Sequence, residues 1–205
     1  MSANLEPYLA SSEYIDWKDP AVSTRAVALS AGCASDEEIA RNCFEFVRDA
    51  ILHSWDHRRN PVTCKASEVL LHATGYCFAK SHLLAALLRA NGIPAGLCYQ
   101  RLAAPGTPPR HYLHGLNAVH LDNHGWYRMD PRGNRPGIAA FFTPPVEAMP
   151  YAANKPGECS LPEIWPEPLP MVVRVLTGYD TVEQVFEHLP DVELAKIAQA
   201  GGRGE

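Results

Sequence analysis

The chain has 205 residues, enough for one domain whose hydrophobic core needs no disulfide or metal for stability. Hydrophobic residues make up 46% of the chain and charged residues 20%, and the formal net charge of −5 argues against a nucleic-acid-binding protein and a basic membrane-surface protein. The sequence lacks an apolar run of membrane-spanning length and the basic and apolar regions of a secretory signal, so we expect a cytoplasmic protein.

Local signals predict two helices in the first third of the chain. Ser35 followed three residues later by Glu38 forms a capping box, and apolar residues then keep helical spacing as far as the boundary near His53. A short second helix is expected over 66–72, before Gly75.

A third, longer helix is predicted over 77–90. Asn91-Gly92 is a stop signal, and Arg89 is suitably placed in the last turn. The buried stripe of this helix would consist of alanine and leucine side chains: Ala79, Leu83, Ala86, Leu87 and Ala90.

After Pro94 the pattern changes to that of strands. We expect strands over 95–102, 115–121 and 126–129, the last two joined as a hairpin by residues 122–125. A further strand is expected over 171–176 and a late helix over 181–188. Helices first and antiparallel strands afterwards indicate an α+β domain, with N-terminal helices packed on an antiparallel sheet.

Prolines mark the domain organisation. Nine of the 18 prolines lie between Pro136 and Pro170, a segment that cannot be regular helix or central strand. We therefore expect one domain over 1–178, with a compact core up to about residue 135 and a proline-rich wrapping segment over 136–170. Residues 179–205 would form a C-terminal helical tail.

Cys77 has the clearest chemical signature of the six cysteines. Gly75-Tyr76-Cys77 is a turn that leads into a long helix, where free backbone N–H groups and the helix dipole favour a thiolate and can stabilise an oxyanion. The alternative is a small buried hydrophobic residue. That description suits Cys43 and Cys98, and the other three lie in or near loops: Cys33, Cys64 and Cys159.

A thiolate nucleophile needs a base and a group that orients this base. A three-residue hairpin loop closed by Gly125 in the left-handed conformation would pair Asp122 with Trp126. His114 and Asp130 then share one face, but they lie four residues apart along the ladder, too far for direct contact in a flat sheet. His120 is a rival base, although it lies nearer the turn.

Three ordered motifs resemble the transglutaminase-like superfamily. They are Thr74-Gly75-Tyr76-Cys77-Phe78-Ala79-Lys80 with the following helix to Ile93-Pro94-Ala95, then His114, then Gly125-Trp126-Tyr127-Arg128-Met129-Asp130-Pro131. The upstream stretch 44–51 is also similar, and the resemblance covers roughly residues 10–135. One departure is Gly115-Leu116, where an aromatic residue often follows the histidine.

The resemblance implies a papain-like α+β core and a catalytic triad of Cys77, His114 and Asp130. We therefore expect a cysteine-dependent hydrolase or acyltransferase that acts on an amide or peptide bond through a thioacyl-enzyme. A protease or amidase is favoured over a transglutaminase, because the chain is short and has no calcium-binding loop. The alternative is a catalytically silent binding module of the same fold. The expected partner is a peptide or amide substrate, with no nucleic acid and no membrane, and the oligomeric state stays open.

A metal site would be the other use of nine histidines and six cysteines. His114 and His120 would stand roughly 20 Å apart on a straight strand, too far to share a zinc ion. The sequence has neither a Cys-x-x-Cys pair nor a His-Glu-x-x-His motif. We predict no metal and no cofactor.

Five further residues near the predicted site have two interpretations each. Lys80 and His82 either add positive charge near Cys77 or are solvated helix side chains. Tyr76 and Trp55 either line the cleft and assist the oxyanion hole or pack in the core. Trp165 either covers the cleft mouth with residues 156–170 or belongs to a segment that wraps the surface, which we favour.

Overall fold

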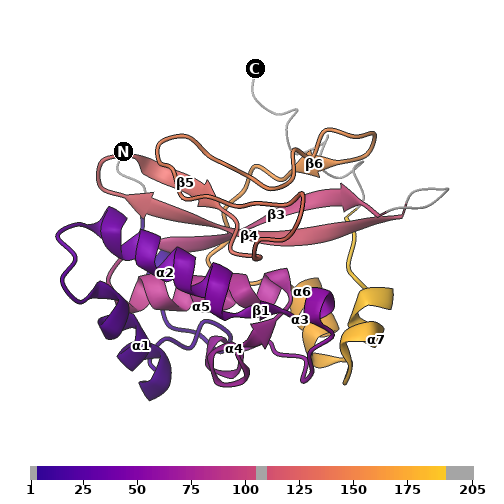
Figure 1. Ribbon diagram of the computed structural model, residues 1–205, viewed down its shortest axis with the longest axis horizontal. Helices are drawn as coiled ribbons and strands as arrows, with labels where there is room; N and C mark the ends of the chain where they lie inside the picture. The colour runs from indigo at the N-terminus through magenta and orange to yellow at the C-terminus, as the bar shows by residue number, and fades with distance from the viewer. Residues whose placement is uncertain (1–3, 105–109, 193–205) are drawn as a thin grey trace.

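The computed structural model describes residues 4–104 and 110–192 and has two layers (Figure 1). A four-stranded antiparallel sheet with strand order β5-β4-β3-β6 forms one layer, and the helices cover one of its faces. The sheet strands are β3 (Ala95–Ala103), β4 (His111–Leu121), β5 (Gly125–Met129) and β6 (Cys159–Ser160). This mixed architecture confirms the predicted α+β class.

Helices precede and follow these strands along the chain, and a small second sheet precedes them. The helices are α1 (Pro20–Ser30), α2 (Asp36–Ala50), α3 (Ser54–His57), α4 (Ala66–His72), α5 (Cys77–Ala90), α6 (Pro170–Thr177) and α7 (Val182–Glu187), and a short 3₁₀ helix spans Glu6–Tyr8. Strands β1 (Leu52–His53) and β2 (Thr74–Gly75) pair in parallel. No helix among residues 4–104 and 110–192 is long and apolar enough to cross a membrane.

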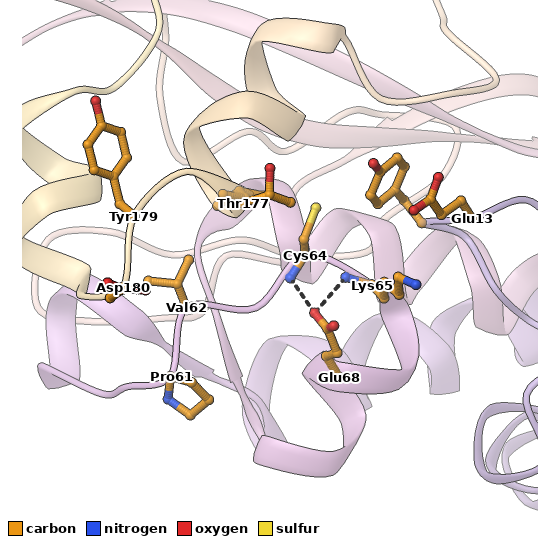
Figure 2. A pocket seen from close by; sticks show the side chains of 11 residues that line it. Glu13, Pro61, Val62, Cys64, Lys65, Glu68, Thr177, Tyr179 and Asp180 are labelled. Carbon is orange, nitrogen blue, oxygen red and sulfur yellow. Dashed lines mark hydrogen bonds between the residues drawn. The ribbon is translucent and has the colours of Figure 1, made fainter.

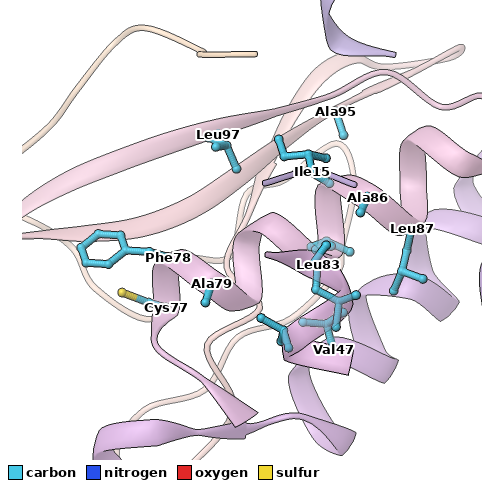
Figure 3. Close-up of a cluster of buried hydrophobic side chains, with 14 of the residues drawn as sticks. Ile15, Val47, Cys77, Phe78, Ala79, Leu83, Ala86, Leu87, Ala95 and Leu97 are labelled. Atoms are coloured by element: carbon cyan, nitrogen blue, oxygen red, sulfur yellow. The ribbon is translucent and has the colours of Figure 1, made fainter. Parts of the chain in front are cut away.

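Helix α5 is the centre of the core. Thirteen of its fourteen residues are buried, so the predicted stripe was too narrow, and Ala90 is only half-buried. Figure 3 shows side chains of α5 such as Leu83 among residues of α2, β3 and the N-terminal segment. A helix that is surrounded on every side cannot be amphipathic, which explains why spacing alone described it poorly.

Polar side chains of α5 are buried with it, contrary to the expectation of solvated side chains. Lys80 is fully buried and donates to the carbonyl oxygens of Arg48 and Ile51 at the C-terminal end of α2. Burial lowers the pKa of Lys80 to about 7. The Nδ1 atom of His82 lies 2.7 Å from the carbonyl oxygen of Cys64, and burial lowers the pKa of His82 to about 4. Both side chains therefore stabilise the packing of α5 and are not exposed to solvent.

The hairpin of β4 and β5 differs in register from the prediction by two residues. Leu121 pairs with Gly125, so the loop consists of residues 122–124, and Gly125 has the expected positive φ of 68°. Continued past the end of β5, the observed register puts Asp130 opposite Leu116, two residues from His114 and not four. With this register His114 and Asp130 still lie on one face of the sheet. The four-residue separation that argued against their direct contact falls to two residues.

The predicted strand over 171–176 is wrong, because these residues belong to helix α6. Pro170 occupies the first turn, where a missing N–H is tolerated. The buried residues of α6 are Val172, Val175 and Leu176, which lie on one helical face. A run of β-branched residues indicated a strand, and tertiary packing outweighs that weak preference.

The proline-rich segment follows the edge of the sheet. Residues Cys159–Ser160 add strand β6 to β3, and further along Trp165 exchanges two backbone hydrogen bonds with Leu97. The ring of Trp165 packs edge-to-face on Tyr99 at 5.3 Å between centroids. This placement agrees with the surface-wrapping interpretation of the segment 156–170.

Candidate active site

Cys77 is the first residue of α5, directly after a constrained turn. Gly75 in β2 pairs with His53 in β1, and the side chain of the N-cap residue Tyr76 makes no capping hydrogen bond. The N–H of Lys80 makes the first hydrogen bond of the helix, to the carbonyl oxygen of Tyr76. The N–H of Cys77 precedes this bond, so it is oriented along the helix axis toward the space beside the sulfur.

His114 and Asp130 are in direct contact behind this cysteine. The Nε2 atom of His114, on β4, lies 2.6 Å from Oδ2 of Asp130, which follows β5. The other carboxylate oxygen of Asp130 accepts the N–H of Arg132 at 2.9 Å. His114 is 4% exposed and Asp130 is 1% exposed. The imidazole is therefore oriented through Nε2, which leaves Nδ1 available for another group.

The surroundings of His114 favour its charged form. Burial alone would lower its pKa, but the Asp130 carboxylate and the Cys77 sulfur together raise the pKa of His114 well above its usual value. The sulfur acts on this imidazole through both charge and a side-chain hydrogen bond. The three residues named from the sequence thus form one connected group.

Gly115 brings β4 close to the start of α5. Its N–H donates to Sγ of Cys77 at 3.4 Å. A Cβ atom at this position would lie 2.7 Å from Cδ1 and 3.1 Å from Cα of Phe78. Gly115, the first residue of the Gly115-Leu116 departure from the family pattern, is therefore required by a close approach of strand and helix.

A cavity of about 290 Å³ opens beside Cys77 and His114. One part of its lining is apolar or aromatic: Trp55, Leu113, Tyr151, Phe186 and Leu189. Tyr151 packs edge-to-face on His114 at 5.0 Å between ring centroids. Phe186 and Leu189 come from the segment expected to be a C-terminal tail. The cavity can hold an organic group next to the sulfur and shield it from water.

Of the residues predicted to line the cleft, Tyr76 and Trp55 do so and Trp165 does not. The hydroxyl of Tyr76 donates to the carbonyl oxygen of Val182 at 2.6 Å, so Tyr76 also joins α7 to this site. Trp165 lies on the sheet edge, against Tyr99. His120, the rival base, packs on Trp126 near the hairpin turn and is outside the cavity lining.

The structure adds a polar group that sequence reasoning missed. His53, Asp56 and Arg132 line the same cavity, and Nη2 of Arg132 bonds to Oδ2 of Asp56 at 2.8 Å. The Nδ1 atom of His53 is buried, has no hydrogen-bond partner among the described residues, and lies 3.8 Å from this same oxygen. Burial, with the nearby cations, lowers the pKa of His53 well below its usual value. His53 lies at this cavity because β1 pairs with β2, and no local sequence motif indicates that pairing.

Three other cysteines are buried outside the cavity that Cys77 lines. Burial raises the pKa of the thiols of Cys43, Cys64 and Cys98 to about 12. A second cavity, of about 340 Å³, is lined by Cys64 (Figure 2). There the Glu68 carboxylate already accepts the N–H groups of Cys64 and Lys65. The lining of this second cavity contains none of the three connected residues.

Metal binding would need several His, Cys, Asp or Glu side chains close together. Across the two described stretches, 4–104 and 110–192, no group of three or more His, Cys, Asp and Glu side chains is placed to hold a metal ion.

Comparisons with known proteins identify the superfamily of this chain. No curated protein matches the sequence. A proposed cysteine protease from Cytophaga hutchinsonii has a similar fold, with a TM-score of 0.51 and 18% identity over 64% of this chain and 43% of that one. A proposed protease from Parabacteroides distasonis matches with a TM-score of 0.40 and 16% identity over 58% of this chain and 23% of that one, too weakly to establish a shared fold. The chain thus spans less than half the length of either structure. The family model of the transglutaminase-like superfamily matches residues 23–131, more than half of the sequence, and the chain belongs to that superfamily.

Proposed function

We propose that this protein is a cysteine-dependent hydrolase of amide or peptide bonds, with Cys77 as nucleophile, His114 as general base and acid, and Asp130 as the group that orients the imidazole. The observation that carries the proposal is the connected group at the start of α5. The His114 imidazole bonds to Asp130 at 2.6 Å, its pKa is raised in part by the Cys77 sulfur, and Cys77 and His114 line one cavity.

The first half of the proposed reaction forms a thioacyl-enzyme. Because the raised pKa of His114 favours an imidazolium, the proton of Cys77 rests on Nδ1 of His114. The thiolate sulfur attacks the carbonyl carbon of the amide. The N–H of Cys77 at the helix start stabilises the oxyanion. The carbon–nitrogen bond then breaks, and His114 returns the proton to the leaving amine.

The second half regenerates the enzyme. Water attacks the thioester carbonyl while His114 takes one of its protons, and the acid leaves as the carbon–sulfur bond breaks, which restores the thiolate and the imidazolium. An amine in place of water would give acyl transfer by the same steps. Hydrolysis is favoured, because the chain is short and its sequence has no calcium-binding loop.

The proposal is tested by trapping the thioacyl-enzyme. Wild-type protein and Cys77→Ala are mixed with p-nitrophenyl acetate, and intact mass is followed with release of p-nitrophenol. We expect an acetyl adduct that maps to Cys77, turns over in water, and is absent from Cys77→Ala. A Cys159→Ala variant is the matched control, because it removes a thiol outside the cavity.

A wild-type protein that acquires no adduct on Cys77 would contradict the proposal. That result would favour the catalytically silent binding module.

A further inference from the structure

The cavity beside Cys77 continues into neighbouring hollows, and Arg135 is common to all of them. Two further hollows, of about 280 and 380 Å³, adjoin the catalytic cavity. One shares His53, Asp56 and Arg132 with that cavity, and the other shares Tyr112 and Tyr151. Arg135 lines all three. An extended cleft of this kind accommodates a substrate larger than a single small amide.

The charged side chains along this cleft leave a positive excess. Four cations, Arg48, Arg132, Arg135 and Lys155, line the three hollows together with three carboxylates, Asp49, Asp56 and Glu158. The whole chain carries a formal charge of −5, so the cleft differs in sign from the protein as a whole. A positive cleft attracts an anionic substrate, most strongly at low ionic strength.

Of the three guanidinium groups in this cleft, that of Arg135 makes the weakest contacts within the protein. Arg48 bonds to Asp49 at 2.7 Å, and Arg132 bonds to Asp56 at 2.8 Å. Arg135 reaches the same Asp56 carboxylate only at 3.8 Å, and its side chain is 49% exposed. Within the described residues, no hydrogen bond from its guanidinium is found. Because the Asp56 carboxylate is already bonded to Arg132, the planar set of N–H donors on Arg135 can bind a ligand.

The backbone at Arg135 is fixed by a tight turn. The N–H and carbonyl of Arg135 exchange two hydrogen bonds with Ile138, both of 2.9 Å. Pro136 and Gly137, with φ of +78°, occupy the two central positions, as the type II turn prefers. The turn follows Asp130 by five residues, so one short segment carries both the proposed triad carboxylate and the exposed guanidinium.

The catalytic cavity also provides an apolar surface. The rings of Trp55 and Phe186 stack at 3.6 Å between centroids, and Arg58 lies over the Trp55 ring at 3.4 Å. Leu113 and Leu189 line the same cavity. An apolar group of the substrate would lose its hydration here and gain contact area.

We propose that the substrate amide bears a carboxylate that binds the guanidinium of Arg135 and an apolar group that packs against Trp55 and Phe186. This inference rests on the proposed thiol chemistry of Cys77. The carboxylate has two possible sources, the free C-terminus of a peptide and an acidic side chain, and both present the same planar anion to the guanidinium.

The test uses alkylating probes that mimic the substrate and need no turnover. N-iodoacetyl-phenylalanine is compared with its neutral amide, which differs only at the C-terminal carboxylate. N-iodoacetyl-glutamic acid α-amide is compared with the corresponding glutamine compound, which differs only in the side chain. The rate of modification of Cys77 is measured by mass spectrometry against probe concentration, at low ionic strength.

In the wild type we expect the charged member of at least one pair to half-saturate at a roughly tenfold lower concentration than the neutral member. Arg135→Gln should lose this preference, and Arg135→Lys should retain part of it. Arg59→Gln is the matched control, because it removes one exposed positive charge outside the three hollows and should keep the preference. The pair that shows the preference identifies the source of the carboxylate.

Equal half-saturation for both pairs in the wild type, or a preference that survives in Arg135→Gln, would overturn this inference and leave the proposed function intact. Modification of Cys77 no faster than that of Cys159 by every probe would overturn the proposed thiol chemistry, and this inference with it. The two failures are therefore distinguishable.

Discussion

Two histidines line the cavity beside Cys77, each with a carboxylate nearby, and their pKa values are shifted in opposite directions. In the first, His114 and Asp130 are 2.6 Å apart, and the pKa of the imidazole is raised. In the second, His53 and Asp56 are 3.8 Å apart, and the pKa of the imidazole is lowered by burial and nearby cations. Similar burial thus gives opposite charge states, because Asp56 is already bound to Arg132 while the oxygen of Asp130 facing His114 has no competing partner among the described residues.

The largest expected effect separates the two carboxylates. Asp130→Asn removes the charge that orients and stabilises the His114 imidazolium, so hydrolysis of p-nitrophenyl acetate should fall by roughly 10²–10⁴-fold. Asp56→Asn should lower the rate less than about tenfold, since Asp56 contacts neither His114 nor Cys77 directly. The measurement is the steady-state rate, with thermal melting to verify that each variant folds. Similar losses in both variants would mean that the two pairs are functionally equivalent, against this account.

A Cβ atom added at Gly115 should disturb the backbone of β4, the strand that carries His114. Gly115→Ala places a Cβ 2.7 Å from the Phe78 ring and should lower the free energy of unfolding by about 1–3 kcal/mol. Gly75→Ala places a Cβ 3.1 Å from that of Ala79 and should cost less. Urea unfolding measures both, and a Gly115→Ala protein as stable as the wild type would show that strand and helix do not approach so closely.

The protonation states of the two histidines can be observed directly. In a histidine-selective NMR titration, His114 should remain an imidazolium above pH 6.5, and His53 should remain neutral below it. Cys77→Ala should lower the pKa of His114, because the sulfur contributes to raising it. A His114 pKa that is the same with and without the sulfur would show that the two groups do not interact.

The smallest effect concerns stability in acid. The pKa of His53 is lower in the folded protein than in the unfolded chain, so below pH 6.5 the unfolded chain binds more protons, and the free energy of unfolding falls with falling pH. His53→Gln should remove this contribution, by at most about 1.4 kcal/mol at pH 5.5. Urea midpoints at pH 7.5 and 5.5 measure the difference. A fall of the same size in both proteins would contradict the assigned neutrality of His53.

Much of the fold around the nucleophile follows from local sequence signals. Helix α5 begins and ends at the predicted residues, because Gly75 before it and Asn91-Gly92 after it are strong boundary signals. The contact between His114 and Asp130 was harder to predict, because a hairpin register shifted by two residues leaves the same side chains on each face of the sheet. The α6 helix was missed because its burial depends on distant partners.

The remainder of the site comes from segments that the sequence does not connect. The parallel pairing of β1 with β2 brings His53 to the cavity beside Cys77. Tyr151, from the proline-rich segment, packs on His114. Such contacts depend on tertiary packing and leave no periodic pattern in the sequence. They explain why three residues could be named in advance while most of the cavity around them could not.

The central claim is that the Cys77 sulfur, next to His114, is the reactive thiol of this protein. The most direct measurement is the rate of iodoacetamide modification of each cysteine between pH 5 and 9, resolved by peptide mass spectrometry, in the wild type and in His114→Asn. We expect Cys77 to react at pH 6 at least about tenfold faster than Cys159, with this advantage lost in His114→Asn. A Cys77 that reacts at pH 6 no faster than Cys159 would contradict the account.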